Sequence, residues 1–117
     1  MNYTFLLPFV PSKDFEISKS FNLALGFEIG YQTDCLVEFH KDNARFYLQK
    51  FYNEVLANNY MLQLNVSSID EFYEFLKSKD EIKTNYKAPQ EMPWGRVIHL
   101  IGPSGELWHI TELTKSI

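Results

Sequence analysis

The side chains best suited to chemistry lie close together near the C-terminus. Two indoles and two imidazoles, those of Trp94, His99, Trp108 and His109, fall within sixteen residues. An imidazole donates or accepts hydrogen bonds, changes its charge near neutral pH and binds metal ions, and an indole offers a broad apolar surface with one donor. This combination favours the binding of a small molecule. A hydrolytic enzyme is less favoured, because no strained strand-to-helix turn presents a serine nucleophile.

The sequence around these residues predicts a β-hairpin that presents them. Residues 96–101 and 106–111 suit strands, and Gly102-Pro103-Ser104-Gly105 between them provides a proline with a fixed φ and a glycine that tolerates a positive φ. Side chains alternate along a strand, so each imidazole faces one side of the sheet. For both His99 and His109, a structural position in the sheet and a contact with a ligand stay open.

Two similar halves make up the chain that positions this hairpin. In the first half we expect a strand over residues 3–10, a helix that Asp14 caps and Gly26 ends, and short strands over residues 27–32, 36–40 and 45–51. In the second half we expect a strand over residues 62–66, a helix that begins at the capping box Ser68-Ile69-Asp70-Glu71, a strand over residues 82–87, a loop over residues 88–93 and the hairpin.

The two halves are also related in sequence. Val10 and Val66, and likewise Ser12 and Ser68, are separated by the same offset of 56 residues. A constant offset close to half the chain length favours an internal duplication. We therefore predict a single α+β domain made of two βαβββ modules, residues 1–56 and 57–117.

Composition narrows the class of protein. The 117 residues are 45% hydrophobic and 16% aromatic, which suits one packed domain. A formal net charge of −4 argues against a nucleic-acid partner and suits a cationic ligand better. The sequence shows neither a leader peptide nor an apolar run of about 18 residues, so we expect neither secretion nor a membrane span. The single cysteine, Cys35, excludes an internal disulfide, and we expect it to be a small buried residue of a cytoplasmic protein.

Several motifs together resemble one superfamily. Phe21-Asn22-Leu23-Ala24-Leu25-Gly26-Phe27 resembles the FY-x-x-LGF signature of the vicinal oxygen chelate superfamily, which includes glyoxalase I, extradiol dioxygenases and bleomycin resistance proteins, and Gly102 to Leu107 resembles its closing strand pair. Residues 8–15, 69–73 and 93–95 are most similar to the bleomycin resistance proteins. Asn22 departs from the signature, which has a tyrosine there. The resemblance implies paired curved mixed sheets around a cleft, and a homodimer that sometimes exchanges an element.

The resemblance also locates the superfamily's four metal-binding strand positions. They correspond here to Leu7, Gln49, Met61 and His109. An alkyl chain has no lone pair and a thioether is a soft ligand, whereas a catalytic zinc site normally keeps three protein ligands. We therefore expect no metal ion and no other cofactor at this site.

Aromatic side chains are the main candidates for ligand binding. We assign most of them to the core by default, namely Phe5, Phe9, Phe21, Phe27, Phe72 and Trp108. Trp94 is the exception, because it lies in a polar loop between Pro93 and Gly95, where the resistance proteins that this chain resembles have a tryptophan at the ligand groove. The predicted ligand-binding residues are Trp94, Tyr47, Gln49, Phe51, His109, His99 and Phe39. Arg96 is expected to pair with Glu106 across the hairpin.

Three functions are compatible with these features. The first is a metal-independent binding protein of the bleomycin-resistance type, a homodimer that sequesters a planar or cationic small molecule in its clefts. The second is a glyoxalase-like metal enzyme, a lyase or transferase, acting on a small carbonyl, thiol or epoxide substrate. The third is a non-catalytic structural or regulatory protein with a filled cavity. The sequence favours the first over an enzyme.

Overall fold

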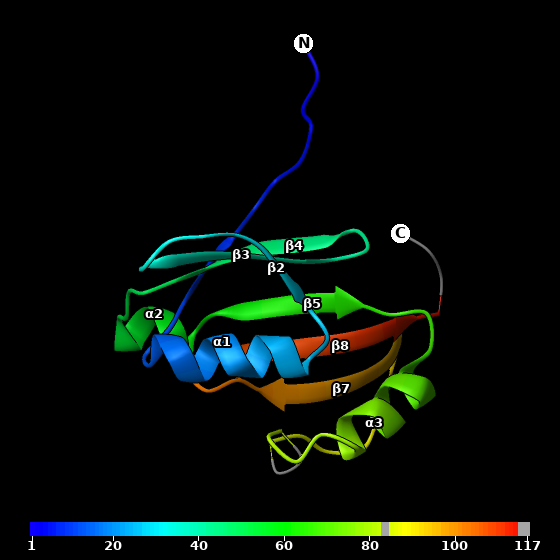
Figure 1. The fold of residues 1–117 in the computed structure, drawn as a ribbon. Coiled ribbons are helices and arrows are strands. Elements are labelled where there is room, and N and C mark those ends of the chain that lie inside the picture. The colour runs from blue at the N-terminus through cyan, green and yellow to red at the C-terminus, as the bar shows by residue number, and fades with distance from the viewer. Residues whose placement is uncertain (83–84, 115–117) are drawn as a thin grey trace.

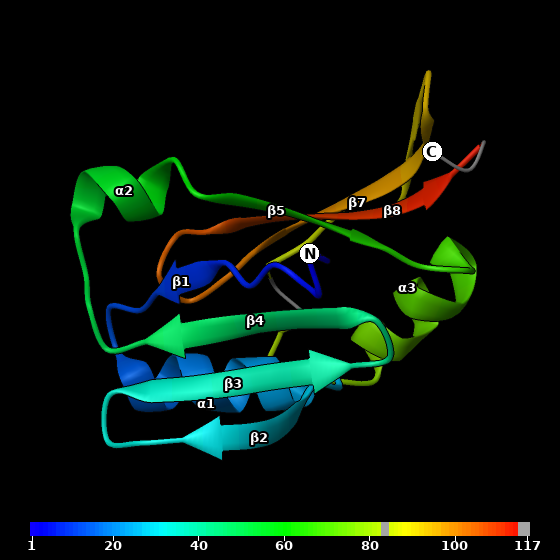
Figure 2. The same cartoon turned by 90° about the horizontal axis from the view of Figure 1, so that it is seen from above.

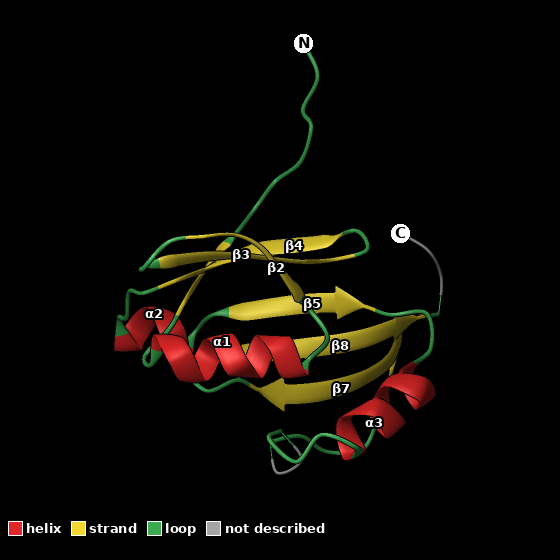
Figure 3. Ribbon diagram, in the orientation of Figure 1, coloured by secondary structure: helices red, strands yellow, loops and turns green. Residues whose placement is uncertain are grey.

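The computed structural model describes residues 1–82 and 85–114 and contains two modules of the same plan (Figures 1 and 3). The elements of the first are β1 (Phe9–Pro11), α1 (Phe15–Ala24), β2 (Glu28–Gln32), β3 (Leu36–Lys41) and β4 (Ala44–Gln49). A short helix, α2 (Glu54–Asn58), leads to the second module. The elements of that module are β5 (Met61–Asn65), α3 (Ile69–Lys77), β6 (Gln90–Met92), β7 (Gly95–Ile101) and β8 (Leu107–Leu113).

Each module contributes one four-stranded mixed sheet. Sheet A has the strand order β1-β4-β3-β2 and sheet B the order β5-β8-β7-β6. In each sheet the first strand of the module pairs in parallel with its last strand, β1 with β4 and β5 with β8, and the other pairs are antiparallel. This identical topology confirms the predicted α+β fold of two βαβββ modules.

The planes of the two sheets lie at an angle to each other. Strands β3 and β4 are seen edge-on in Figure 1 and face-on in Figure 2, whereas β5, β7 and β8 show the opposite. Helix α1 lies below sheet A and in front of sheet B, in the angle between them (Figure 1). Both modules therefore bury their inner faces in one shared core, formed mainly by Phe21, Phe27, Val37, Phe39, Phe46, Leu48, Ile69, Leu76, Ile98, Leu100, Trp108 and Ile110.

Local signals in the sequence set the element boundaries as predicted. The Asp14 side chain accepts a hydrogen bond from the Ile17 N–H at 3.0 Å, and the Ser68 Oγ accepts one from the Glu71 N–H at 3.2 Å. Both are N-cap bonds that satisfy a free amide of the first turn. The hairpin between β7 and β8 is also confirmed, and Gly105 in its turn has a φ of 93°.

The N-terminal strand is shorter than predicted. Strand β1 begins at Phe9, and residues 1–8 form an extended arm that projects from sheet A on the side away from α1 (Figure 1). Phe5 is 63% exposed and Phe9 48% exposed, so their assignment to the core was wrong. Phe5 lies in the arm, and Phe9 lies in β1 on the face opposite to the buried Val10. Cys35 is also exposed, because it lies in the turn between β2 and β3 rather than in a strand.

The connection between α3 and β7 also differs from the prediction. Tyr86 forms a single bridge with Leu100 in place of the predicted strand over residues 82–87, of which Lys83 and Thr84 lie outside the described residues. The predicted loop contains β6, which pairs with β7. Helix α2 was not predicted; its cap is Asn53, whose Oδ1 accepts from the Leu56 N–H at 3.0 Å.

The predicted ion pair between Arg96 and Glu106 is wrong. Arg96 Nη1 lies 3.0 Å from Asp70 Oδ1, and its Nε lies 3.1 Å from Glu91 Oε1. The register of the hairpin explains the difference, because it places Glu112 opposite Arg96 and leaves Glu106 in the turn before β8.

Candidate functional site

The outer faces of the two sheets carry the candidate ligand-binding residues. In β4, Phe46 and Leu48 are buried in the core, so Arg45, Tyr47 and Gln49 alternate onto the opposite face. In β8, Trp108 and Ile110 are core residues and His109 alternates outward. We call these surfaces the outer face of sheet A and the outer face of sheet B.

An aromatic pair forms the centre of the outer face of sheet A. Phe9 and Tyr47 occupy paired positions of β1 and β4, and their ring centroids are 4.9 Å apart at an interplanar angle of 33°. Gln49 is half-buried further along β4, and Phe51 lies just beyond the end of that strand with 51% of its surface exposed. Tyr47, Gln49 and Phe51 therefore lie near one another, and Phe9 joins them although the sequence placed it in the core.

A partly buried charge cluster lies next to this aromatic pair. Glu38 of β3 is opposite Tyr47 and only 5% exposed. Its Oε2 accepts a hydrogen bond from Arg45 Nε at 3.3 Å and lies 3.1 Å from His40 Nδ1. Gly30 makes room for this carboxylate, because a Cβ there would overlap Glu38 Oε1. His40, near the end of β3, thus contacts this buried acid.

Sequence reasoning did not identify Glu38, although a signal for it exists. Glu38 lies between the apolar residues Val37 and Phe39, and the aromatic Tyr47 lies opposite it on the neighbouring strand. Two carboxylates, Glu28 and Glu38, surround His40, and one guanidinium, that of Arg45, offsets them. The two carboxylates outnumber the guanidinium at this corner, which favours a cation nearby.

Two imidazoles lie side by side on the outer face of sheet B. His99 of β7 is directly opposite His109 of β8, and Gln63 of β5 is opposite His109 on the other side. The ring centroids of the two histidines are 5.0 Å apart. Partial burial lowers the pKa of His109, and the charge of a protonated His99 lowers that pKa further. His109 is therefore neutral at pH 7.

Trp94 lies at the tip of the hairpin between β6 and β7. Its side chain is 53% exposed, and its carbonyl oxygen accepts a hydrogen bond from the Thr114 N–H at 2.9 Å. Met92 and Gly95 pair on either side of the turn, so the turn geometry holds the indole at the edge of sheet B. Trp108, by contrast, is 2% exposed and belongs to the core, as predicted.

Phe39 lies in the core rather than on a surface. Its side chain is fully buried and stacks on Phe46 with ring centroids 5.6 Å apart. Because Phe39 and Phe46 are paired across β3 and β4, Phe39 faces the side opposite to Tyr47. It cannot contact a ligand on the outer face without a rearrangement of the core.

The candidate residues thus form two groups that one chain does not bring together. Phe9, Tyr47, Gln49 and Phe51 belong to the first module, and His99, His109 and Trp94 belong to the second. The outer faces of the two sheets point in different directions (Figures 1 and 2).

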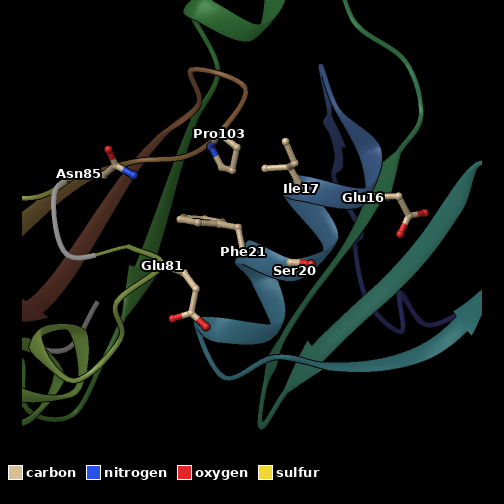
Figure 4. A pocket seen from close by; sticks show the side chains of 7 residues that line it. All are labelled: Glu16, Ile17, Ser20, Phe21, Glu81, Asn85 and Pro103. Atoms are coloured by element: carbon tan, nitrogen blue, oxygen red, sulfur yellow. The ribbon is translucent and has the colours of Figure 1, made fainter.

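Two of the recesses in the described part of the chain are relevant to a binding site. One, of about 320 Å³, lies between the modules; Pro8, Arg45, Met61 and Gln63 line it, together with the buried rings of Phe46 and Trp108. The other, of about 400 Å³, lies beside α1 (Figure 4). Ile17, Phe21 and Pro103 point toward one another there, and the carboxylates of Glu16 and Glu81 point away. Neither recess contains Trp94, Tyr47 or His109.

The four strand positions that hold a metal ion in the vicinal oxygen chelate superfamily do not fit one here. Gln49 belongs to sheet A, whereas Met61, which is 65% exposed, and His109 belong to sheet B. Leu7 lies in the N-terminal arm and offers no lone pair. In residues 1–82 and 85–114 no group of three or more His, Cys, Asp or Glu side chains could hold a metal ion.

Comparison with known proteins identifies the fold. No family model and no curated protein matches the sequence. Among solved structures, a bleomycin-binding protein complexed with bleomycin is 23% identical with a TM-score of 0.80, over 94% of this chain and 98% of that chain. A bleomycin resistance determinant encoded on the transposon Tn5 is 21% identical with a TM-score of 0.80, over 97% and 100% of the two chains.

Proteins of other descriptions share the fold. The bleomycin-binding protein from Streptomyces verticillus, complexed with copper(II)-bleomycin, is 19% identical with a TM-score of 0.80, over 96% and 98% of the two chains. A lactoylglutathione lyase from Agrobacterium tumefaciens is 11% identical with a TM-score of 0.71, over 95% of each chain. This chain therefore has the fold of the glyoxalase and bleomycin resistance proteins, and the predicted resemblance is confirmed at the level of the fold.

No helix among the described residues is long and apolar enough to cross a membrane. The longest, α1, has ten residues. A span of the bilayer core needs about 20 apolar residues in a helix.

Proposed function

We propose that this chain is a homodimeric small-molecule binding protein that sequesters a planar or cationic ligand, without a metal ion at the four strand positions described above. The observation that carries the proposal is the exposure of flat aromatic groups on the outer faces of a fold shared with bleomycin-binding proteins. Large exposed apolar groups of this kind mark binding surfaces in soluble proteins.

The outer face of sheet A supports a planar and cationic ligand. The Phe9 and Tyr47 rings offer an apolar platform, and the excess negative charge around Glu38 lies beside it. A flat cation stacked there would gain both apolar contact and attraction to the ring faces. The net charge of −4 adds a weaker, longer-range attraction.

The arrangement of the two sheets supports a homodimer. A cleft that contains Tyr47 and Phe51 together with Trp94 and His109 is available only if sheet A of one protomer faces sheet B of its partner. Apolar side chains at the outer surfaces would be covered by such a contact, since Phe9, Met61 and Ile101 are all about half exposed or more. The N-terminal arm adds Tyr3 and Leu6, which are almost fully exposed.

We place the protein in the cytoplasm. Cys35 is a free and exposed thiol, and it is the only cysteine of the chain. Exposed unpaired thiols are better suited to a reducing compartment than to the cell exterior, where they oxidise or cross-link.

A fluorescence titration tests the proposed ligand class. Trp94 is exposed and Trp108 is buried, so stacking of a ligand on Trp94 should quench the exposed fraction of the emission. The probes are bleomycin and ethidium, titrated against the wild-type protein and against Trp94→Phe. We expect saturable quenching in the wild type that is lost in the variant. An absence of quenching by either probe at high micromolar concentration would contradict the proposal.

A metal-dependent enzyme is the alternative, since a lactoylglutathione lyase shares the fold. The chemistry of Leu7 and Met61 disfavours it, because neither residue replaces the hard or borderline ligands that such a site needs. Turnover of a thiohemiacetal substrate by protein loaded with zinc, nickel or manganese would favour the enzyme. Tight binding of bleomycin or ethidium to metal-free protein would favour sequestration.

A further inference from the structure

Three side chains with nitrogen or oxygen lone pairs form a row across the outer face of sheet B. Gln63, His109 and His99 occupy directly opposed positions on β5, β8 and β7. Gln63 Nε2 donates a hydrogen bond to Asn65 Oδ1 at 2.8 Å, which turns the amide and leaves its Oε1 available. The three side chains therefore lie on one face of sheet B at neighbouring strand positions.

The two imidazoles of this row have no hydrogen-bond partner in the described part of the chain. Their rings contact each other, with centroids 5.0 Å apart at an interplanar angle of 74°. His40 provides a contrast, since its Nδ1 lies 3.1 Å from Glu38 and its Nε2 lies 3.8 Å from Glu28. The ring nitrogens of His99 and His109 are therefore available to another molecule or ion.

The distance between the two rings matches that of two imidazoles on one metal ion. An imidazole nitrogen binds such an ion at about 2.0–2.1 Å and lies about 1.1 Å from the centre of its ring. Two such ligands at about 90° to about 109° therefore have ring centres about 4.5 to about 5.2 Å apart. The observed separation of 5.0 Å falls in this interval.

The surroundings of the pair are electrically neutral. The register places only uncharged residues with the two histidines on this face, among them Met61 and Asn65 of β5, Leu107 and Thr111 of β8, and Val97 and Ile101 of β7. No lysine or arginine of β5, β7 or β8 lies on this face, so none of them repels a bound cation.

From this geometry we infer that His99 and His109 together form a binding site for a divalent transition-metal ion, with Gln63 Oε1 as a third donor and solvent in the remaining positions. Imidazole ligands suit copper, nickel and zinc, and copper(II) binds most tightly among the divalent ions of this series. The site shares His109 with one of the four superfamily positions, but its other donors, His99 and Gln63, lie at none of the other three. It also shares His109 with the proposed ligand-binding residues, and copper(II) binding in the absence of any other ligand tests it apart from the proposed function.

Copper(II) itself is the probe for the test. We expect electron paramagnetic resonance spectra of the one-to-one mixture to show coupling to two imidazole nitrogens. His99→Ala and His109→Ala should each weaken copper(II) binding at least tenfold, and Gln63→Leu should weaken it less. His40→Ala is the matched control and should retain the wild-type affinity, because His40 is bonded to Glu38.

A second measurement on the unmodified protein does not depend on the folding of variants. The chain has three histidines. Substoichiometric copper(II) should broaden the imidazole proton signals of His99 and His109 before that of His40. Equal broadening of all three signals, or an unchanged affinity in the variant that lacks both His99 and His109, would overturn the inference and leave the N-terminal amine or another surface group as the copper ligand.

Discussion

Glu106 is a buried acid whose ionisation should make the stability of the protein depend on pH. The side chain is fully buried in the turn that precedes β8. Its Oε1 accepts a hydrogen bond from the Ser104 N–H at 3.0 Å, while its Oε2 has no partner among the described residues. Gly102 packs against the carboxyl group so closely that a Cβ there would overlap it. The carboxyl group is therefore shielded from bulk solvent.

Burial raises the pKa of Glu106 above its ordinary value. Backbone N–H groups oppose this rise, as does the indole of Trp108, which lies nearby without reaching hydrogen-bonding geometry. The folded protein therefore holds a proton that the unfolded chain has already lost. The free energy of unfolding should fall as pH rises from the unfolded pKa to the folded pKa, and stay level above it. One proton limits the slope to about 1.4 kcal/mol per pH unit.

The substitution Glu106→Gln should remove this slope. The amide has the shape of the carboxylic acid, keeps an acceptor for the Ser104 N–H and carries no charge at any pH. Above the folded pKa the variant should be more stable than the wild type, and near pH 4 the difference should shrink or reverse. Urea unfolding followed by tryptophan fluorescence, from about pH 4 to about pH 8, measures both curves.

Glu16→Gln is the matched control for this series. The Glu16 side chain is 77% exposed, and it pairs with Lys19 at 3.4 Å on the surface of α1. Such an exposed pair contributes little to stability. Its removal should leave the pH dependence of the wild type in place. A constant difference between Glu106→Gln and the wild type across the whole pH range would refute the argument, because Glu106 would then titrate alike in the folded and unfolded chains.

Three further perturbations test other parts of the molecule. His109→Ala should weaken ethidium binding by about 1 to 3 kcal/mol and abolish the loss of affinity at acidic pH. In the wild type this loss should begin below the ordinary histidine pKa, because burial and His99 lower the pKa of His109. An unchanged pH profile in the variant would mean that His109 is only part of the sheet. Gly30→Ala should lower the free energy of unfolding by about 1 to 3 kcal/mol, since its Cβ would displace Glu38, and an unaltered urea midpoint would contradict that packing. Sedimentation equilibrium at tens of micromolar should give twice the chain mass of 13.8 kDa, and a monomer would count against the dimer.

The sequence predicted the parts of the fold that depend on short-range signals. Asp14 and Ser68 cap their helices because an N-cap bond spans only three residues, and the turn before Gly105 forms because its residues favour the required dihedral angles. The repeated order of elements then determines two sheets of equal topology. The module boundaries at residues 56 and 57 stay a prediction.

The candidate site was harder to predict, because it depends on which face of each strand is covered. The turn at Asp42 pairs Lys41 with Ala44, and this register places Phe39 opposite Phe46 and Glu38 opposite Tyr47. Alternation combined with this register puts Phe39 and Tyr47 on opposite faces. Alternation could not show which face α1 covers, because that depends on contacts between residues far apart in the chain. The burial of Glu106 is a long-range feature of the same kind.

Binding and dimerisation are linked in this fold if the two candidate groups act on one ligand. Tyr47 lies on sheet A and Trp94 at the edge of sheet B, and the outer faces of the two sheets diverge within a chain. A ligand that contacts both residues must bind two protomers at once, so it stabilises the dimer by the same free energy that dimerisation adds to ligand binding. Its apparent affinity should then rise with protein concentration until the dimer is fully formed. A ligand that quenches Trp94 with an affinity independent of protein concentration, in a preparation that sediments as a monomer, would instead contact the tip of the β6–β7 hairpin alone, and the aromatic platform on sheet A would need another explanation.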